Sequence, residues 1–195
     1  MAVKDDGIIA AELTDVPGLE YAYKLESEED IVHKNVRELC FDAIRHFSPT
    51  QIQNHPKKAL RARSFAPPPN SQYQGEIHRT LYLVTGGRCR IHSEFSYTTK
   101  GKVDFFVNNR RWGIEVMREG DRLQANLDGF KPDVKYGSWK LVDDWIILDF
   151  RQTEPPDQEI RDDPRLFVVV FQPDLESYKI LNGLHQTVVE WTNLL

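Results

Sequence analysis

The spacing of the apolar residues changes at Gly86-Gly87, which separates a helical part of the chain from a part rich in strands. Before the glycine pair, apolar residues recur at steps of three and four, as on one face of an amphipathic helix. Two such stripes are present: Val32, Val36, Leu39, Cys40, Ala43, Ile44 and Phe47 form the first, and Tyr73, Ile77, Leu81 and Val84 the second. They predict a helix that ends at Ser48-Pro49 and a second helix over residues 71–84. The Pro-rich residues between them, 48–71, are expected to form an extended linker.

After the glycine pair, apolar residues alternate with polar ones, which is typical of half-buried strands. Three strands are expected, over residues 88–98, 102–108 and 111–118. Asp121 is then expected to cap a third helix. The apolar stripe of that helix consists of Leu123, Leu127 and Phe130.

The last part of the chain contains two uninterrupted apolar runs, 145–150 and 166–171. Continuous runs of this kind indicate strands that are covered on both faces. Residues 175–195 are apolar enough to pack on the domain, either as a strand followed by a helix or as one helix. The elements therefore predict an α/β fold with a mixed sheet. Residues 1–70 supply an acidic segment, an added N-terminal helix and a basic linker, and residues 71–195 form the main domain.

Composition favours one folded domain with an extension. The chain of 195 residues, 40% hydrophobic and 28% charged, is long and apolar enough to bury one core. Cys40 and Cys89 lack the spacing of a disulfide framework or a zinc site. No apolar stretch reaches the roughly 20 residues of a membrane span, and the acidic start of the sequence lacks the pattern of a signal peptide. We therefore expect no membrane partner.

The charge is distributed unevenly along the chain. Residues 1–30 carry a net charge of −7, whereas residues 57–118 carry +8. A basic stretch of this kind can attract nucleic acid, most simply DNA. The expected contacts are Lys57, Lys58, Arg61 and Arg63. The alternative is that the basic side chains are spread over several faces of the fold and form no patch.

Two acidic residues lie in the middle of neighbouring predicted strands. Strand alternation predicts that Asp104 and Lys102 share one face, opposite Val103 and Phe105. Glu115 occupies the middle of the next strand. Two carboxylates that project from adjacent strands offer the hard oxygen ligands that Mg²⁺ requires in phosphodiester hydrolysis. The alternative is that both acids lie at a solvated sheet edge or pair with arginines.

This pair and the order of the elements resemble a known nuclease plan. Asp104 followed by Glu115-Val116-Met117, within the order helix, three strands, helix, strand, is similar to the D…(D/E)xK signature and αβββαβ core of the PD-(D/E)XK, or restriction-endonuclease-like, superfamily. The resemblance implies a metal site of Asp104 and Glu115 with Mg²⁺ as cofactor. It also implies that Glu76 is the acid contributed by the first core helix. For Glu76 the alternative is an ion pair with Arg79, one turn later.

The catalytic lysine of that superfamily is absent. Met117 stands in its place and cannot donate a charged hydrogen bond to phosphate. Lys102, on the same strand face as the first acid, is the best placed substitute, and Arg122 is the second. Arg118 is expected to point away, because neighbouring strand residues face opposite sides.

A second resemblance covers most of residues 71–195. The segments that carry it are Gln74-Gly-Glu-Ile-His-Arg, Gly101-Lys-Val-Asp-Phe-Phe-Val, Trp112-Gly-Ile-Glu-Val-Met-Arg-Glu-Gly-Asp-Arg-Leu and Trp145-Ile-Ile-Leu-Asp-Phe-Arg-Gln-Thr. They look like the nuclease-like C-terminal domains of Crinkler proteins, modular effectors of oomycetes and fungi that are delivered into host cells, where many act in the nucleus. In that family leucine commonly occupies the position of Met117. This chain departs from the family at Asn126 and Gly129, where related sequences have a histidine and an arginine, and it lacks the usual LFLAK-type header.

Three functional hypotheses follow. In the first, the protein is a Crinkler-type effector domain, secreted into a host cell, that binds nucleic acid or a host nuclear protein with weak or no hydrolysis. In the second, it is an active Mg²⁺-dependent DNase in which Asp104 and Glu115 hold the metal, Glu76 assists, and Lys102 or Arg122 replaces the lysine. In the third, it is a homodimeric interaction module that uses its N-terminal helix and its C-terminal tail.

Overall fold

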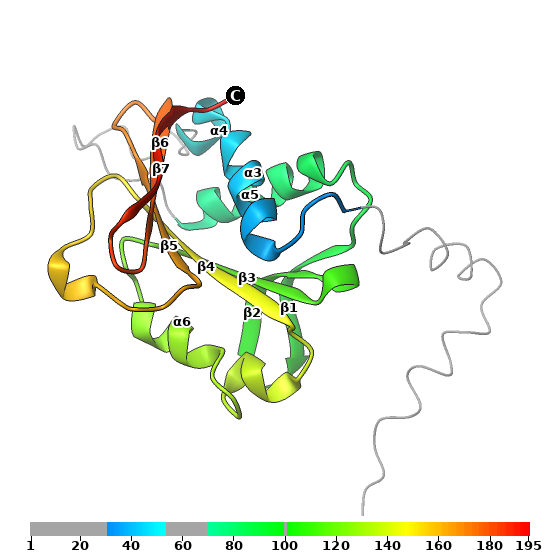
Figure 1. The fold of residues 1–195 in the computed structure, drawn as a ribbon. Helices are drawn as coiled ribbons and strands as arrows, with labels where there is room; N and C mark the ends of the chain where they lie inside the picture. Colours follow the sequence, from blue (N-terminus) through cyan, green and yellow to red (C-terminus); the bar gives the residue numbers. More distant parts are fainter. Residues whose placement is uncertain (1–30, 54–69, 100) are drawn as a thin grey trace, which may run out of the picture.

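The protein is an α/β structure built on one mixed sheet of seven strands. The computed structural model describes residues 31–53, 70–99 and 101–195. Helices cover both faces of the sheet: α3, α4 and α5 lie on one side and α6 on the other (Figure 1). The basic residues predicted to contact nucleic acid lie outside the described residues; they are Lys57, Lys58, Arg61 and Arg63.

The elements follow the predicted order. The helices are α3 (Val36–Arg45), α4 (Pro49–Gln53), α5 (Asn70–Val84) and α6 (Leu123–Gly129), with the 3-10 helices η3 (Asn108–Arg110), η4 (Lys135–Trp139) and η5 (Asp157–Glu159). The strands are β1 (Ile91–Thr98), β2 (Gly101–Val107), β3 (Trp112–Arg118), β4 (Asp144–Arg151), β5 (Leu166–Phe171), β6 (Ser177–Asn182) and β7 (Thr187–Asn193). The succession α5, β1, β2, β3, α6, β4 matches the prediction, and the α/β class with a mixed sheet is confirmed.

The strands lie side by side in the order in which they occur in the sequence. β3 pairs antiparallel with β2 and parallel with β4, and β4 pairs parallel with β5. Parallel neighbours need a crossover connection, and α6 with η4 provides it between β3 and β4. β3 therefore lies inside the sheet, and all of its residues except Arg118 are buried.

The two larger of the three hydrophobic clusters among the described residues lie on the two faces of the sheet. The larger one joins α3 and α5 to the sheet through residues such as Leu39, Tyr73 and Phe150. The smaller one joins α6 and η4 to the sheet through residues such as Leu127 and Ile147. The N-terminal helix therefore shares its core with the second half of the chain. A membrane-crossing helix, long and apolar enough to span a bilayer, is not found among residues 31–53, 70–99 and 101–195.

The segment predicted as a linker contains a helix in its first part. Residues 49–53 form α4, with Pro49 as its first residue, where proline fits because its missing N–H has no helical partner. Ile52 is completely buried in the larger cluster. The expectation of an extended linker is therefore wrong for these five residues, and residues 54–69 lie outside the described part.

Three further expectations are corrected by the structure. The tail contains no helix within residues 175–195; it forms the antiparallel strands β6 and β7. Asp121 does not cap α6, because the helix begins after Arg122, which has a left-handed backbone and makes no side-chain cap hydrogen bond. Val103 packs in the α6-side cluster, whereas Phe105 packs on the α5 side, so the strict alternation expected for this strand fails at its start.

Candidate functional site

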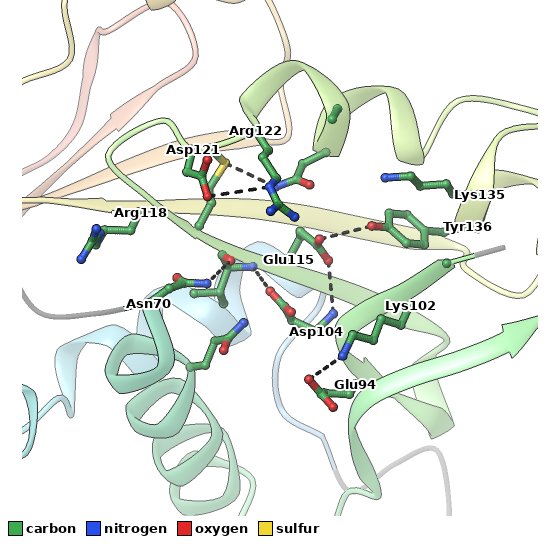
Figure 2. A pocket seen from close by; sticks show the side chains of 16 residues that line it. Asn70, Glu94, Lys102, Asp104, Glu115, Arg118, Asp121, Arg122, Lys135 and Tyr136 are labelled. Atoms are coloured by element: carbon green, nitrogen blue, oxygen red, sulfur yellow. Dashed lines mark hydrogen bonds and ion pairs between the residues drawn. The ribbon is translucent and has the colours of Figure 1, made fainter. Parts of the chain in front are cut away.

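The carboxyl groups of Asp104 and Glu115 meet where β2 and β3 separate. Regular pairing of the two strands runs from Val107 opposite Trp112 to Phe105 opposite Ile114. One residue further along, the side chains of Asp104 and Glu115 accept the hydrogen bonds of the backbone N–H groups of the opposite strand. The N–H of Val116 donates to Asp104 Oδ2 at 2.8 Å, and the N–H of Asp104 donates to Glu115 Oε2 at 3.2 Å. The predicted convergence of the two acids is therefore present (Figure 2).

Both carboxyl groups are held in an environment that disfavours their charge. Burial, and then the charge of Asp104, raises the pKa of Glu115 to about 8. Burial also raises the pKa of Asp104, although hydrogen bonds from the Val116 N–H and the Gln74 side chain oppose this effect. Two neighbouring buried carboxylates cannot both ionise without a compensating positive charge. The pair is thus set to bind either a proton or a cation.

The pair forms the floor of a cavity of about 590 Å³, which we call the acidic pocket. Its lining comes from α5, the β1–β2 hairpin, β3, the start of α6 and η4 (Figure 2). Four of the lining residues are acidic, namely Glu94, Asp104, Glu115 and Asp121, and four are basic, namely Lys102, Arg118, Arg122 and Lys135. The basic residues surround the carboxyl pair, an arrangement that suits an anionic ligand together with a metal ion.

The predicted substitutes for the missing lysine both line the acidic pocket. Lys102 lies on β2, and its ammonium group pairs with Glu94 Oε1 at 2.6 Å. Arg122 lies at the start of α6 and is 80% exposed, 4.0 Å from Asp121. Arg118, which was expected to point away, also lines the pocket.

Met117 packs away from solvent in the α6-side cluster and is 3% exposed. Its sulfur accepts a weak contact from Asn126 Nδ2 at 3.9 Å. A buried packing residue therefore occupies the position at which the expected signature would have its lysine. Asn126 lines the acidic pocket.

Glu76 lies apart from the acidic pocket. It is 4% exposed, and Arg79 Nη2 and Nε donate to its two oxygens at 2.6 and 3.0 Å. The backbone N–H of Ser48 also donates to it. The expected catalytic role for Glu76 is therefore not supported by its position, because the side chain joins α5 to the turn before α4. The ion pair with Arg79, the alternative interpretation, is confirmed.

Tyr136 is a pocket residue that the sequence did not single out. Its hydroxyl donates to Glu115 Oε1 at 3.2 Å. The ring lies over Gly129, where a Cβ atom would be 2.6 Å from Tyr136 Cε2. Only a residue without a side chain at position 129 leaves room for the ring. Gly129 was noted in the sequence, but nothing in the sequence connected it with Tyr136.

A buried ion cluster holds the loop that carries Asp121 and Arg122. Arg151 Nε donates to Asp149 Oδ2 at 2.6 Å, and its Nη2 contacts Glu159. Asp149 Oδ1 accepts the backbone N–H of Gly120 at 3.0 Å. A Cβ at Gly120, whose φ is +71°, would lie 2.5 Å from Arg151 Nη2. The two sequence segments Trp112–Leu123 and Trp145–Thr153 therefore bind each other beside the pocket.

The donor set suits Mg²⁺ better than a transition metal. Within residues 31–53, 70–99 and 101–195, no three or more His, Cys, Asp or Glu side chains gather as a metal cluster. Mg²⁺, however, is commonly held by one or two carboxylates, with water and ligand phosphates completing its shell. Asp104 and Glu115 meet that requirement.

Comparisons of the chain with protein-family models, with curated proteins and with solved structures give no significant match. The site is therefore interpreted from its own residues and geometry.

Proposed function

We propose that the protein is a Crinkler-type effector domain with a restriction-endonuclease-like core, whose acidic pocket binds nucleic acid together with Mg²⁺ and hydrolyses it weakly or not at all. The observation that carries the proposal is the pair of the partly buried Asp104 and the buried Glu115, joined across two strands and lined by basic side chains. Two charged acids side by side in a largely buried site repel each other, and a bound cation would offset that repulsion.

In this proposal Asp104 and Glu115 would hold the metal, which would supply charge neutralisation at a phosphate group. Tyr136 orients Glu115 through its hydroxyl. Lys102, Arg122 and the other rim cations attract the phosphates. Weak hydrolysis follows from Met117, which offers no charge to the scissile group. Delivery into a host cell and action in its nucleus, on DNA or a nuclear protein, are proposed from the family resemblance.

An active DNase is the second candidate, because Lys102 lines the same pocket as the two acids. Its ammonium group pairs with Glu94, which is itself 72% exposed, so the pair can open at little cost. Plasmid degradation that requires Mg²⁺, and that disappears in both Asp104→Ala and Lys102→Ala, would establish this candidate. Degradation that survives Lys102→Ala would exclude this lysine as the substitute.

The interaction module is the third candidate, and one arrangement favours it. The N-terminal helix and the C-terminal tail adjoin: the N–H of Leu195 donates to the carbonyl of Arg45 at 2.8 Å, and α3 and β7 border a shared depression of about 540 Å³. Assembly that is insensitive to salt, without DNA binding, would favour this candidate, because phosphate contacts weaken steeply with salt.

The test of the proposed function is calorimetric titration with Mg²⁺ or Mn²⁺. Wild-type protein is compared with Glu115→Gln, and with Glu190→Gln on the exposed strand β7 as the matched control. We expect Glu115→Gln to weaken metal binding at least about tenfold, which corresponds to about 1.4 kcal/mol, and Glu190→Gln to leave it unchanged. Equal binding by all three proteins, or none by any, would remove the metal site.

A further inference from the structure

The ammonium group of Lys102 is engaged by a neighbouring carboxylate. Lys102 Nζ donates to Glu94 Oε1 at 2.6 Å, and both residues line the acidic pocket. Figure 2 shows the ammonium group directed toward Glu94. The other candidate substitute for the missing lysine, Arg122, approaches Asp121 only to 4.0 Å. Of the two candidates, Lys102 therefore has the closer acidic partner.

Glu94 reaches this position through a distorted backbone. Its φ is +51°, in the left-handed region that residues other than glycine rarely adopt. The strand register that pairs Phe95 with Val103 places Glu94 at the level of Asp104, and the pairing of β1 with β2 becomes irregular just after Phe95. Because β1 is an edge strand, nothing in the sheet pairs with its outer side. A carboxylate is therefore held beside Asp104 by a local distortion of the sheet edge.

The charges of Lys102 and Glu94 act on Asp104 in opposite directions. Burial is the main cause of the raised pKa of the Asp104 carboxyl group; the positive charge of Lys102 lowers this pKa, and the negative charge of Glu94 raises it. Glu94 therefore adds a negative charge close to the carboxyl pair, and it also engages the positive charge that would attract a phosphate group. Both effects disfavour an anionic ligand.

We infer that Glu94 limits the affinity of the acidic pocket for the phosphates of nucleic acid, because it holds the ammonium group of Lys102 away from the ligand. This inference rests on the proposed function and deepens it, since it names the residue that sets how strongly the pocket binds. The ion pair is open to solvent, with Lys102 54% and Glu94 72% exposed, so its strength is limited. Glu94 therefore weakens binding severalfold and does not abolish it.

The experiment removes the charge of Glu94 and keeps the size of its side chain, in the variant Glu94→Gln. Binding of a fluorescein-labelled DNA duplex of about 20 base pairs is measured by anisotropy at about 50 mM and about 200 mM salt, with Ca²⁺ in place of Mg²⁺. We expect Glu94→Gln to bind at least about threefold more tightly than the wild-type protein at the lower salt concentration. The gain should shrink by about a factor of three at the higher one, because one added contact between lysine and phosphate loses that much over this range.

A second background separates release of Lys102 from a general loss of negative charge. Most of the gain from Glu94→Gln should disappear in a protein that already carries Lys102→Ala. An equal gain in the two backgrounds overturns the inference, because it shows only a general repulsion of DNA by Glu94. Unchanged or weaker binding by Glu94→Gln also overturns it, while the proposed function stands. Absence of DNA binding by the wild-type protein and by the variant overturns the proposed function itself, and the inference with it.

Two further variants control for net charge and for the fold. Glu190→Gln removes the same charge from β7, at the opposite edge of the sheet, and should leave DNA binding unchanged. Glu94→Gly removes the carboxylate at a positive φ that glycine adopts without strain. It should bind DNA as tightly as Glu94→Gln and unfold at no lower temperature than the wild-type protein. A folded Glu94→Gly that binds DNA only as the wild-type protein does, or a gain in Glu190→Gln equal to that in Glu94→Gln, would overturn the inference.

Discussion

Replacing Gly129 with alanine tests how the wall of the acidic pocket is built. A Cβ atom at this position would lie 2.6 Å from Tyr136 Cε2, and 3.2 Å from Cδ2 and from Cζ. Carbon atoms in contact prefer about 3.5–4.0 Å, so the ring would have to move by about 1 Å. It has little room to do so, because it is 3% exposed and packs against Phe130 at 4.6 Å and Trp139 at 5.5 Å between ring centres.

The expected magnitude is a balance of two effects. Overpacking of a buried site costs about 1–3 kcal/mol. Alanine is favoured over glycine within a helix by up to about 1 kcal/mol, which offsets part of the cost. We therefore expect Gly129→Ala to lower the free energy of unfolding by about 0.5–2 kcal/mol, measured by urea denaturation.

The chain offers a matched control in Gly75. This residue lies inside α5, and a Cβ atom there would meet nothing within 4 Å. Gly75→Ala should therefore raise the free energy of unfolding by about 0.5–1 kcal/mol. The difference between the two variants measures the overpacking cost alone.

A double-mutant cycle identifies the clashing partner. If the ring of Tyr136 causes the loss, alanine at position 129 should cost nothing in a protein that already carries Tyr136→Ala. Gly129→Ala that stabilises the protein as much as Gly75→Ala does would refute the reasoning. The same holds for a loss that persists unchanged in the double variant.

Three further predictions concern the buried acids and the first helix. The pKa of Glu115 is raised to about 8 from an ordinary value of 4.5. Between these two pH values the folded protein keeps a proton that the unfolded chain has lost. The free energy of unfolding should therefore fall as pH rises through this window. Glu115→Gln should reduce that fall by about 2–4 kcal/mol, measured by urea unfolding at about pH 5 and about pH 9. Identical pH profiles of the wild-type protein and the variant would mean that the carboxyl group is ionised throughout. Arg151→Met leaves the carboxylate of Asp149, 1% exposed, without its partner and should cost about 3–5 kcal/mol, most of it recovered when Asp149→Leu is added; a loss below about 1 kcal/mol would contradict a tightly coupled pair. Asn35→Ala removes the side chain that accepts the N–H of the first turn of α3 at 2.9 Å and should cost about 1 kcal/mol, whereas Asn35→Asp should cost little; equal stability of all three proteins would show that this cap is not needed.

Much of the candidate site could be predicted from two adjacent strands. The positions of Asp104 and Glu115 within β2 and β3 follow from alternation and from the short connection between the strands, both of which are local properties. Their burial and their hydrogen bonds with opposing backbone N–H groups were not predictable, because these depend on where the sheet separates. Tyr136 could not be predicted either, since it comes from η4, beyond α6 in the sequence.

Glu76 shows why a residue of the expected type in the expected helix was a poor guide. Its helix, α5, was predicted correctly, but the direction of one side chain depends on what packs beside the helix. Here α3 and the start of α4 place the Ser48 N–H next to it, and Arg79 completes its hydrogen bonds. A charged group buried at 4% exposure takes the nearest donors.

The C-terminal tail illustrates a limit of periodicity. Short apolar segments are compatible with both a helix and a strand when they are read alone. β6 forms because the edge of β5 offers backbone partners along its length, with Phe171 opposite Tyr178, and β7 then pairs with β6. The pairing joins consecutive strands across short turns, and the apolar pattern within the tail does not by itself report these turns or the edge of β5.

The sequence by itself determined the elements whose pattern is local: α3 and α5 from their apolar stripes, β1 to β5 from alternation and continuous runs, and the presence of two acids on neighbouring strands. The tertiary structure decided which groups meet. It placed the Tyr136 hydroxyl within hydrogen-bond distance of Glu115, with the ring packed over Gly129. It placed Glu76 outside the pocket, and it holds the loop that carries Arg122 through the ion pair of Asp149 and Arg151. The physical reason is range: periodicity and capping depend on residues within one or two turns, whereas burial, pKa and the shape of a pocket depend on side chains that only packing brings together.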